Sequence, residues 1–218
     1  MKLTDVVVNT VVLSSFEENS YVVSKRDASE AVVVDPGASS ASLIKFLKSR
    51  KLVVQAVLIT HGHYDHIAGV PDLKKNWPDA AVFIGEKDLD KLSDPFGNLS
   101  AYFERTTSVE VDARVVSESD VLNFADLTFK VIEIPGHSRG HVGYLLETEE
   151  SPLLFCGDAV FAGSIGRTDF PDGDYKVLMD SIARKIATLP PDATLYPGHG
   201  PRTTVNDEKN SNPFFKNI

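Results

Sequence analysis

Three of the six histidines of this 218-residue chain fall within six positions, in the stretch THGHYDHIAG. His61, His63 and His66 are interleaved with Asp65, and the stretch begins where the apolar run VQAVLIT ends. Imidazole and carboxylate groups packed this closely are costly to bury unless they share a partner. The fold must therefore bring this loop together with a partner that these imidazole and carboxylate groups share.

The remaining histidines also follow apolar runs. His137 and His141 follow VIEIPG, His199 follows LYPG, and Asp158 follows LLFCG. A lone histidine at a strand end is more often a surface residue than a ligand, but every histidine of this chain lies in one of these clusters. Because loops at strand ends converge in layered α/β proteins, we expect these groups to meet at a metal site.

The spacing H-x-H-x-D-H predicts that one loop serves two ions. His61 and His63, two apart, can turn toward the first ion, while Asp65 and His66 can face a second. Imidazole and carboxylate ligands suit zinc and also accept iron or manganese. We expect two divalent ions, with zinc as the first choice and iron or manganese as alternatives.

Apolar patterning predicts strands early and late in the chain with helices among them. The expected strands are 5–13, 20–24, 30–37, 54–60, 80–84, 127–136, 141–148, 151–158 and 193–200, and the expected helices are 39–51, 67–77, 173–189 and a helical stretch over 85–106. This order is typical of packed layers of sheet and helix, an α/β or layered α+β protein. Without a low-complexity segment or linker, residues 1–218 are expected to form a single domain.

Four motifs together resemble those of the metallo-β-lactamase fold superfamily of hydrolases. They are THGHYDH at 60–66, PGHSRGH at 135–141, FCGD ending at Asp158 and PGHG starting at Pro197. The resemblance implies an αββα sandwich with a dinuclear metal site at one edge of its two sheets. It assigns His61, His63 and His137 to the first metal, Asp65, His66 and His199 to the second, and Asp158 as the bridge.

Catalytic roles are expected for two residues. Two divalent ions about 3.5–4 Å apart lower the pKa of a shared water from ~15.7 toward ~7, and Asp65 would orient the resulting hydroxide. His141, four residues after His137, is expected to line the cavity and hydrogen-bond the substrate or a ligand. Asp35, at the end of EAVVVDPG, has two open interpretations: the partner of a ligand imidazole, or a plain turn residue.

Within the superfamily, GSIGRTDFPDGDY at 163–175 and the ending PGHGPRTT resemble single-domain, glyoxalase-II-like metallohydrolases. That resemblance implies hydrolysis of a small thioester, such as the S-acylglutathione S-lactoylglutathione. Where the family has a Lys-x-Tyr pair this chain has Arg167-Thr168-Asp169, so Arg167 is the candidate substrate-binding cation. The C-terminal helical domain of full-length glyoxalase II is not expected, which weakens the case for glutathione recognition.

An alternative comes from persulfide dioxygenases of the same fold, which share a segment like GRTDF at 166–170. They use one iron ion, and His61, His137 and Asp158 could supply its two-histidine, one-carboxylate ligand set. His141 and the PGHG segment fit the hydrolase pattern instead, which places the dioxygenase second.

Composition excludes several other classes. The formal charge of −9 and the short basic runs argue against a nucleic-acid partner. No apolar run reaches the ~20 residues of a membrane span, and no signal peptide is recognisable, so we expect a cytoplasmic protein without membrane partners. Cys156 is expected to be a buried strand thiol. The loop Asp94 to Tyr102 is either a second wall of the substrate site or an ordinary connection.

Overall fold

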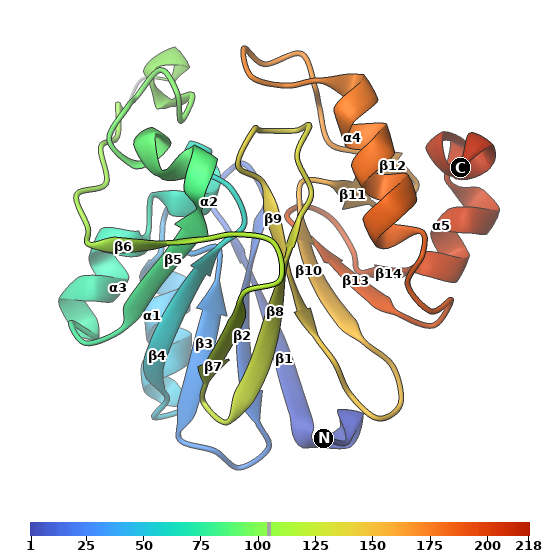
Figure 1. Cartoon of the computed structure of the whole chain (residues 1–218). Coiled ribbons are helices and arrows are strands. Elements are labelled where there is room, and N and C mark those ends of the chain that lie inside the picture. Colours follow the sequence, from blue (N-terminus) through green and yellow to red (C-terminus); the bar gives the residue numbers. More distant parts are fainter. Residues whose placement is uncertain (104–105) are drawn as a thin grey trace.

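The computed structural model describes residues 1–103 and 106–218, and its two six-stranded sheets pack face to face (Figure 1). The first sheet has the order β1-β2-β3-β4-β5-β6, antiparallel over its first three strands and parallel from β3 onward. Its strands are β1 (Val6–Leu13), β2 (Glu18–Lys25), β3 (Glu30–Val34), β4 (Val53–Ile59), β5 (Ala81–Gly85) and β6 (Ala113–Val116).

The second sheet has the order β14-β13-β10-β9-β8-β7, in which β10 and β13 are the parallel pair. Its strands are β7 (Val121–Phe124), β8 (Leu127–Glu133), β9 (Val142–Leu146), β10 (Leu153–Gly157), β13 (Thr194–Pro197) and β14 (Thr203–Thr204). A separate two-stranded hairpin pairs β11 (Val160–Phe161) with β12 (Ser164–Ile165).

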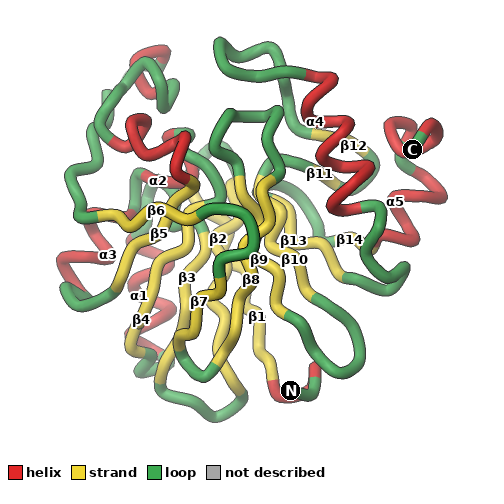
Figure 2. The backbone as a smooth tube through the Cα atoms, viewed as in Figure 1, coloured by secondary structure: helices red, strands yellow, loops and turns green. Residues whose placement is uncertain are grey.

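Helices cover the outer face of each sheet (Figure 2). The first sheet is covered by α1 (Ala41–Ser49) and α3 (Val70–Asn76), and the second by α4 (Tyr175–Ser181), which continues as a π-helical turn (Ile182–Ile186), and by α5 (Val205–Ser211). The short helix α2 (Tyr64–Ile67) follows β4, and 3-10 turns span Leu3–Asp5, Glu86–Leu92, Ser100–Tyr102 and Pro213–Asn217. Within the described ranges, no helix has the length and apolarity needed to cross a bilayer.

Strict alternation along the strands produces three apolar layers. In β2, Tyr21 and Val23 point between the sheets while Val22 points toward the helices of the first sheet. In β10, Phe155 points between the sheets and Cys156 toward the helices of the second sheet. Both faces of each sheet are therefore buried, which confirms the expected αββα sandwich.

The local differences from expectation have physical causes. The helix expected over 67–77 is broken because the Gly69 N–H donates to the Pro36 carbonyl at 2.8 Å, leaving α2 and α3 as separate helices. The stretch 85–106 contains only short 3-10 turns, and its residues 104–105 lie outside the described part. Strands β6 and β7 are only four residues long and helix α5 is largely polar, so the apolar patterning did not predict these three elements.

The carboxyl ends of β4, β8, β10 and β13 meet at one edge of the sandwich, at the top of Figure 1. Backbone hydrogen bonds join the two sheets there. The Val142 N–H donates to the Thr60 carbonyl at 2.8 Å, and the Asn19 N–H donates to the Gly198 carbonyl at 2.7 Å. This edge is where all the predicted ligands lie.

Candidate metal centre and active-site cavity

Four of the seven predicted ligands come from the loop after β4, and Asp35 fixes that loop. The Thr60 N–H and hydroxyl both donate to the Asp35 carboxylate at 2.7 Å, and His66 Nδ1 donates to it at 2.9 Å. Asp35 follows β3, the parallel neighbour of β4, which places its carboxylate beside the loop. Of its two interpretations, the structure supports the partner of a candidate ligand imidazole.

The first group consists of three histidine rings whose nitrogens converge. His137 Nε2 lies 3.2 Å from His61 Nε2 and 3.0 Å from His63 Nδ1. His137 Nδ1 donates to the Arg167 carbonyl at 2.7 Å, and His61 Nδ1 lies 3.1 Å from the Thr60 hydroxyl, whose own proton goes to Asp35. These bonds place the ring protons on Nδ1, so the facing Nε2 atoms both carry lone pairs.

The second group combines Asp65 with two histidines. Asp65 Oδ2 lies 3.2 Å from His199 Nε2 and 3.8 Å from His66 Nε2. His199 Nδ1 donates to the Phe16 carbonyl at 3.0 Å, as His66 Nδ1 donates to Asp35. Both rings therefore turn their Nε2 atoms toward the same carboxylate oxygen, the arrangement expected of metal-binding histidines.

Asp158 lies between the two groups. Its Oδ2 is 3.5 Å from His137 Nε2 in the first group, and its Oδ1 is 3.4 Å from His66 Nε2 in the second. One carboxylate can therefore contribute an oxygen to each group, as the sequence resemblance implies for a bridging ligand. The assignment of these seven side chains as ligands stays a prediction, but the structure brings all of them together.

The residues fit divalent cations on their own chemistry. Within each group the ligand atoms lie within 4.8 Å of one another. His66 Nε2 and Asp158 Oδ1 are buried without a hydrogen-bond partner, and burial lowers the pKa of His61 and His137, so neutral rings face each other with their lone pairs. A shared cation satisfies these atoms at once.

Charge favours a cation in the second group as well. Burial alone would lower the pKa of His66, but Asp158, Asp65 and Asp35 outweigh it and raise that pKa. Burial likewise raises the pKa of Asp65, and His66 and His199 outweigh it so that Asp65 stays ionised. The carboxylates thus attract positive charge to the point where the three ligand atoms converge.

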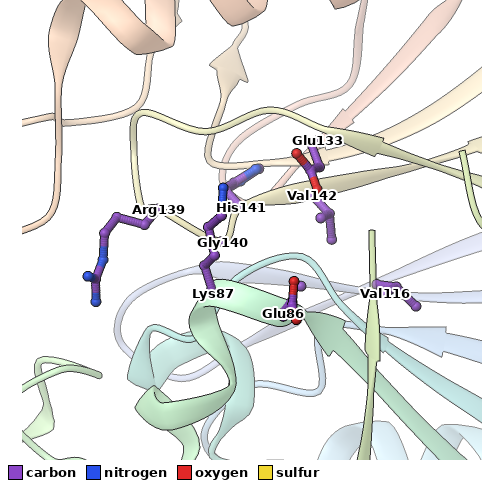
Figure 3. Close-up of a pocket in the computed structure, with 9 residues that line it drawn as sticks. Glu86, Lys87, Val116, Glu133, Arg139, Gly140, His141 and Val142 are labelled. Carbon is purple, nitrogen blue, oxygen red and sulfur yellow. The ribbon is translucent and has the colours of Figure 1, made fainter. Parts of the chain in front are cut away.

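His141 is buried behind the first group. Its ring stacks on His61 with 5.0 Å between centroids, and its Nε2 accepts a hydrogen bond from the Asp158 N–H at 3.1 Å. Figure 3 shows it, with Lys87 and Arg139, among the residues that line a pocket of about 10 Å³, room for no more than a water. Of the two expected partners, substrate or ligand, the structure shows a bond to the predicted ligand Asp158, and the catalytic role of His141 stays a prediction.

Asp88 is a positioning residue that the sequence did not reveal. Its Oδ2 accepts from the Gly62 N–H at 2.9 Å and from the Ser138 hydroxyl at 2.6 Å, while its Oδ1 accepts from the Gly140 N–H at 2.8 Å. Gly62 belongs to the loop after β4, and Ser138 and Gly140 belong to the loop that carries His137. One buried carboxylate therefore joins two ligand loops from different sheets.

A cavity of about 450 Å³ opens above the two groups. It is lined by Phe16, His63, Tyr64, Asp65, Asn98, Leu99, Phe103, His137, Asp158, Phe161, Arg167, Phe170 and His199. Asn98 and Leu99 belong to the loop Asp94 to Tyr102, whose Asn98 carbonyl accepts from the Tyr64 N–H at 2.8 Å. This loop therefore forms part of the cavity wall, the first of the two interpretations given for it.

Arg167 lines the cavity, but its charge already has a partner. Its Nε and a terminal nitrogen donate to the Asp169 carboxylate at 2.9 and 2.8 Å, and its Cζ lies 4.5 Å from the centre of the Phe170 ring. The substrate-binding role of Arg167 stays a prediction.

Cys156 is fully buried, with its Sγ 3.6 Å from the Val160 carbonyl and 3.5 Å from the Tyr196 carbonyl. Burial raises the pKa of this thiol to about 12. It is the expected buried strand thiol, and it lies outside the cavity lining.

Comparison with known proteins identifies relatives of one family. The metallo-beta-lactamase superfamily pattern matches residues 15–199. Hydroxyacylglutathione hydrolase GloC of Haemophilus influenzae is 32% identical over 95% of this chain and 97% of its own. The BLEG-1 B3 metallo-beta-lactamase structure superposes with a TM-score of 0.90 at 36% identity over 96% and 99% of the two chains. The structure of TTHA1623 in a di-iron-bound form superposes with a TM-score of 0.81 at 33% identity, over 95% of this chain and 100% of the other.

Metal content tests the assignment of ligands. We expect the metal-replete protein to hold two divalent ions per chain, measured by elemental analysis. Asp158→Ala should weaken both sites because it removes an oxygen from each group, whereas His199→Ala should cost only the second ion. A stoichiometry near one that neither substitution changes would contradict the dinuclear arrangement.

Asp88 offers a second test, with Asp90 of the same turn as its control. Asp88→Asn removes the charge 3.3 Å from the buried Lys91 ammonium, which keeps Asp172 as a partner, and weakens the bonds to both loops. We expect a loss of about 1–3 kcal/mol in the free energy of unfolding and weaker metal binding. Asp90→Asn, at an exposed residue, should change neither the free energy of unfolding nor metal binding. If the two variants behave alike in denaturation and metal titration, Asp88 does not position the ligand loops.

Proposed function

Because the chain belongs to the metallo-β-lactamase superfamily, we propose that it is a metal-dependent thioester hydrolase acting on S-acylglutathiones such as S-lactoylglutathione or on related small thioesters. The observation that carries the proposal is the pair of complete ligand groups joined by Asp158 at the floor of the cavity. The relative named hydroxyacylglutathione hydrolase GloC, which aligns over nearly all of both chains, supports the thioester as the bond cleaved.

The ligand assignment gives each ion three side chains of its own. We propose that His61, His63 and His137 hold the first ion, that Asp65, His66 and His199 hold the second, and that Asp158 contacts both. When bound, two divalent ions supply an activated water at neutral pH and polarise the carbonyl of the substrate. Zinc is the proposed metal; iron and manganese are alternatives, and one similar protein was solved with two irons.

Asp65 is the residue proposed to orient the attacking water. It is ionised and lines the cavity, so its carboxylate can accept a hydrogen bond from a water held at the floor. His199 fixes one of its oxygens at 3.2 Å. Asp65 thus combines a ligand role with a positioning role for the nucleophile.

The cavity also favours a leaving group that departs without a proton. Outside the proposed ligands, its titratable side chains among the described residues are Tyr64 and Arg167. The guanidinium is not an acid, so the Tyr64 phenol is the one candidate proton donor among them. A thiolate with a pKa near the ~8.5 of free cysteine departs unprotonated, whereas an amide or β-lactam nitrogen needs a proton. This difference supports a thioester over an amide.

The persulfide dioxygenase alternative requires only His61 and His137 of the first group together with Asp158. It leaves Asp65, His66 and His199 without a function, although His66 Nε2 is buried without a hydrogen-bond partner and His199 is held by the Phe16 carbonyl. A complete second group is what a dinuclear hydrolase uses. We therefore rank the hydrolase first.

Thioester turnover tests the proposal. We expect S-lactoylglutathione to be hydrolysed with a high KM, activity to be lost on chelation, and zinc, manganese or iron to restore it. Asp65→Asn should lower kcat by about 100-fold or more, within the range for a general base or orienting group. Glutathione persulfide with iron-loaded protein is the comparison: oxygen uptake faster than thioester turnover would favour the dioxygenase.

A further inference from the structure

Besides the proposed ligands, the cavity is lined largely by aromatic side chains. On one side Phe16, Tyr64 and Phe103 form a first aromatic wall, with Phe16 edge-on to Tyr64 at 6.0 Å and to Phe103 at 5.0 Å between ring centroids. Phe103 keeps 47% of its surface exposed at the rim. Rings of this kind bind apolar or aromatic groups well.

A second aromatic wall flanks the proposed ligands themselves. Phe170 lies 5.4 Å from the His63 ring and 6.1 Å from the His137 ring, and Phe161 lies 6.0 Å from the His199 ring. Each of these rings lines the cavity. A substrate carbonyl at the floor is therefore close to apolar surface contributed by both walls.

The one positively charged side chain of the described cavity lining already has a partner. Arg167 is the one permanent cation among the described lining residues, and Asp169 holds it in a two-pronged ion pair at 2.9 and 2.8 Å. The Asp169 carboxylate takes up two of the guanidinium nitrogens and offsets the charge of Arg167. A carboxylate of glutathione would have to compete with Asp169 for that cation.

We propose that this site takes neutral thioesters with an apolar acyl group, of phenyl or branched-aliphatic size, and that Asp169 keeps the Arg167 charge from recruiting carboxylates. The inference rests on the proposed thioester hydrolysis and narrows its substrate class. Pockets of about 300–1,000 Å³ typically hold small organic ligands, and this cavity of about 450 Å³ lies in that range.

An acyl series tests the apolar preference. The substrates are N-acetylcysteamine thioesters, neutral at the thiol end, carrying acetyl, isovaleryl or phenylacetyl groups. We expect kcat/KM to rise by roughly tenfold or more from acetyl to phenylacetyl, because burial of a phenyl ring removes apolar area from water. S-lactoylglutathione should be a poorer substrate than the phenylacetyl thioester.

Two aromatic residues of one loop region provide the matched variants. Phe103→Ala removes a ring from the first wall and should lower the ratio of phenylacetyl to acetyl kcat/KM by about fivefold. Phe96, also exposed, lies on an adjacent pocket with Asp90 and Arg139 rather than on the cavity. Phe96→Ala should keep the wild-type ratio.

Asp169→Asn tests the charge pairing. Freed from its partner, Arg167 should lower the KM for S-lactoylglutathione by about threefold, the scale of an exposed ion pair. The effect should vanish when Arg167→Ala is added, since no cation is then released. The phenylacetyl thioester is the control: because it is neutral, its KM should be the same in Asp169→Asn and in the wild type.

The outcomes separate the two proposals. No metal-dependent turnover of any thioester would refute the proposed function. Turnover that prefers S-lactoylglutathione over every neutral thioester, or that is independent of acyl size, would overturn this inference while leaving thioester hydrolysis in place. Equal acyl preference in Phe103→Ala and Phe96→Ala would also overturn it.

Discussion

Repulsion between imidazole lone pairs is the constraint on which the rest of this structure depends. His137 Nε2 is held within 3.0 and 3.2 Å of two other ring nitrogens in a site with little water, and the bonds at Nδ1 of His137 and His61 keep protons away from the facing atoms. Such a cluster has a low free energy only around a cation. Hydrogen bonds from the surrounding residues fix the orientation of these rings.

That orientation is supplied by both sheets acting on each other's loops. Asn19 of β2 donates to the Pro197 and Gly200 carbonyls at 3.1 and 2.8 Å, and the Tyr21 hydroxyl donates to the Pro197 carbonyl at 2.6 Å. These bonds hold the His199 loop of the second sheet against the first. Together with the Asp88 carboxylate they make the ligand geometry a property of the sheet-to-sheet interface rather than of any single loop.

The sequence revealed the parts of the site that carry their chemistry in residue type. The seven predicted ligands follow apolar runs, so pattern and spacing place them at strand ends, and the resemblance carried by the motifs implies the αββα layers. Asp88 could not be found this way, because GEKDLDKL has the appearance of a charged surface segment and only the packing buries it. The orientation of His141 depended on its backbone partner at Asp158, which spacing does not encode.

Long-range contacts explain the other omissions. Glu18 lies in a strand with an unremarkable sequence, yet it is fully buried beside the second group, and burial raises the pKa of its carboxyl. The nearby carboxylates of Asp35, Asp65 and Asp158 raise this pKa further. Its neighbours come from distant parts of the chain, so neither its burial nor its protonation can be read from local sequence.

The position of the single cysteine affects how the protein can be handled. Cys156 sits inside the layer between the second sheet and its helices, with a pKa of about 12. A thiol released by the proposed thioester hydrolysis can therefore be followed continuously with a disulfide reagent without background labelling of the folded protein. The same reagent reports unfolding, because Cys156 becomes accessible only when that layer opens.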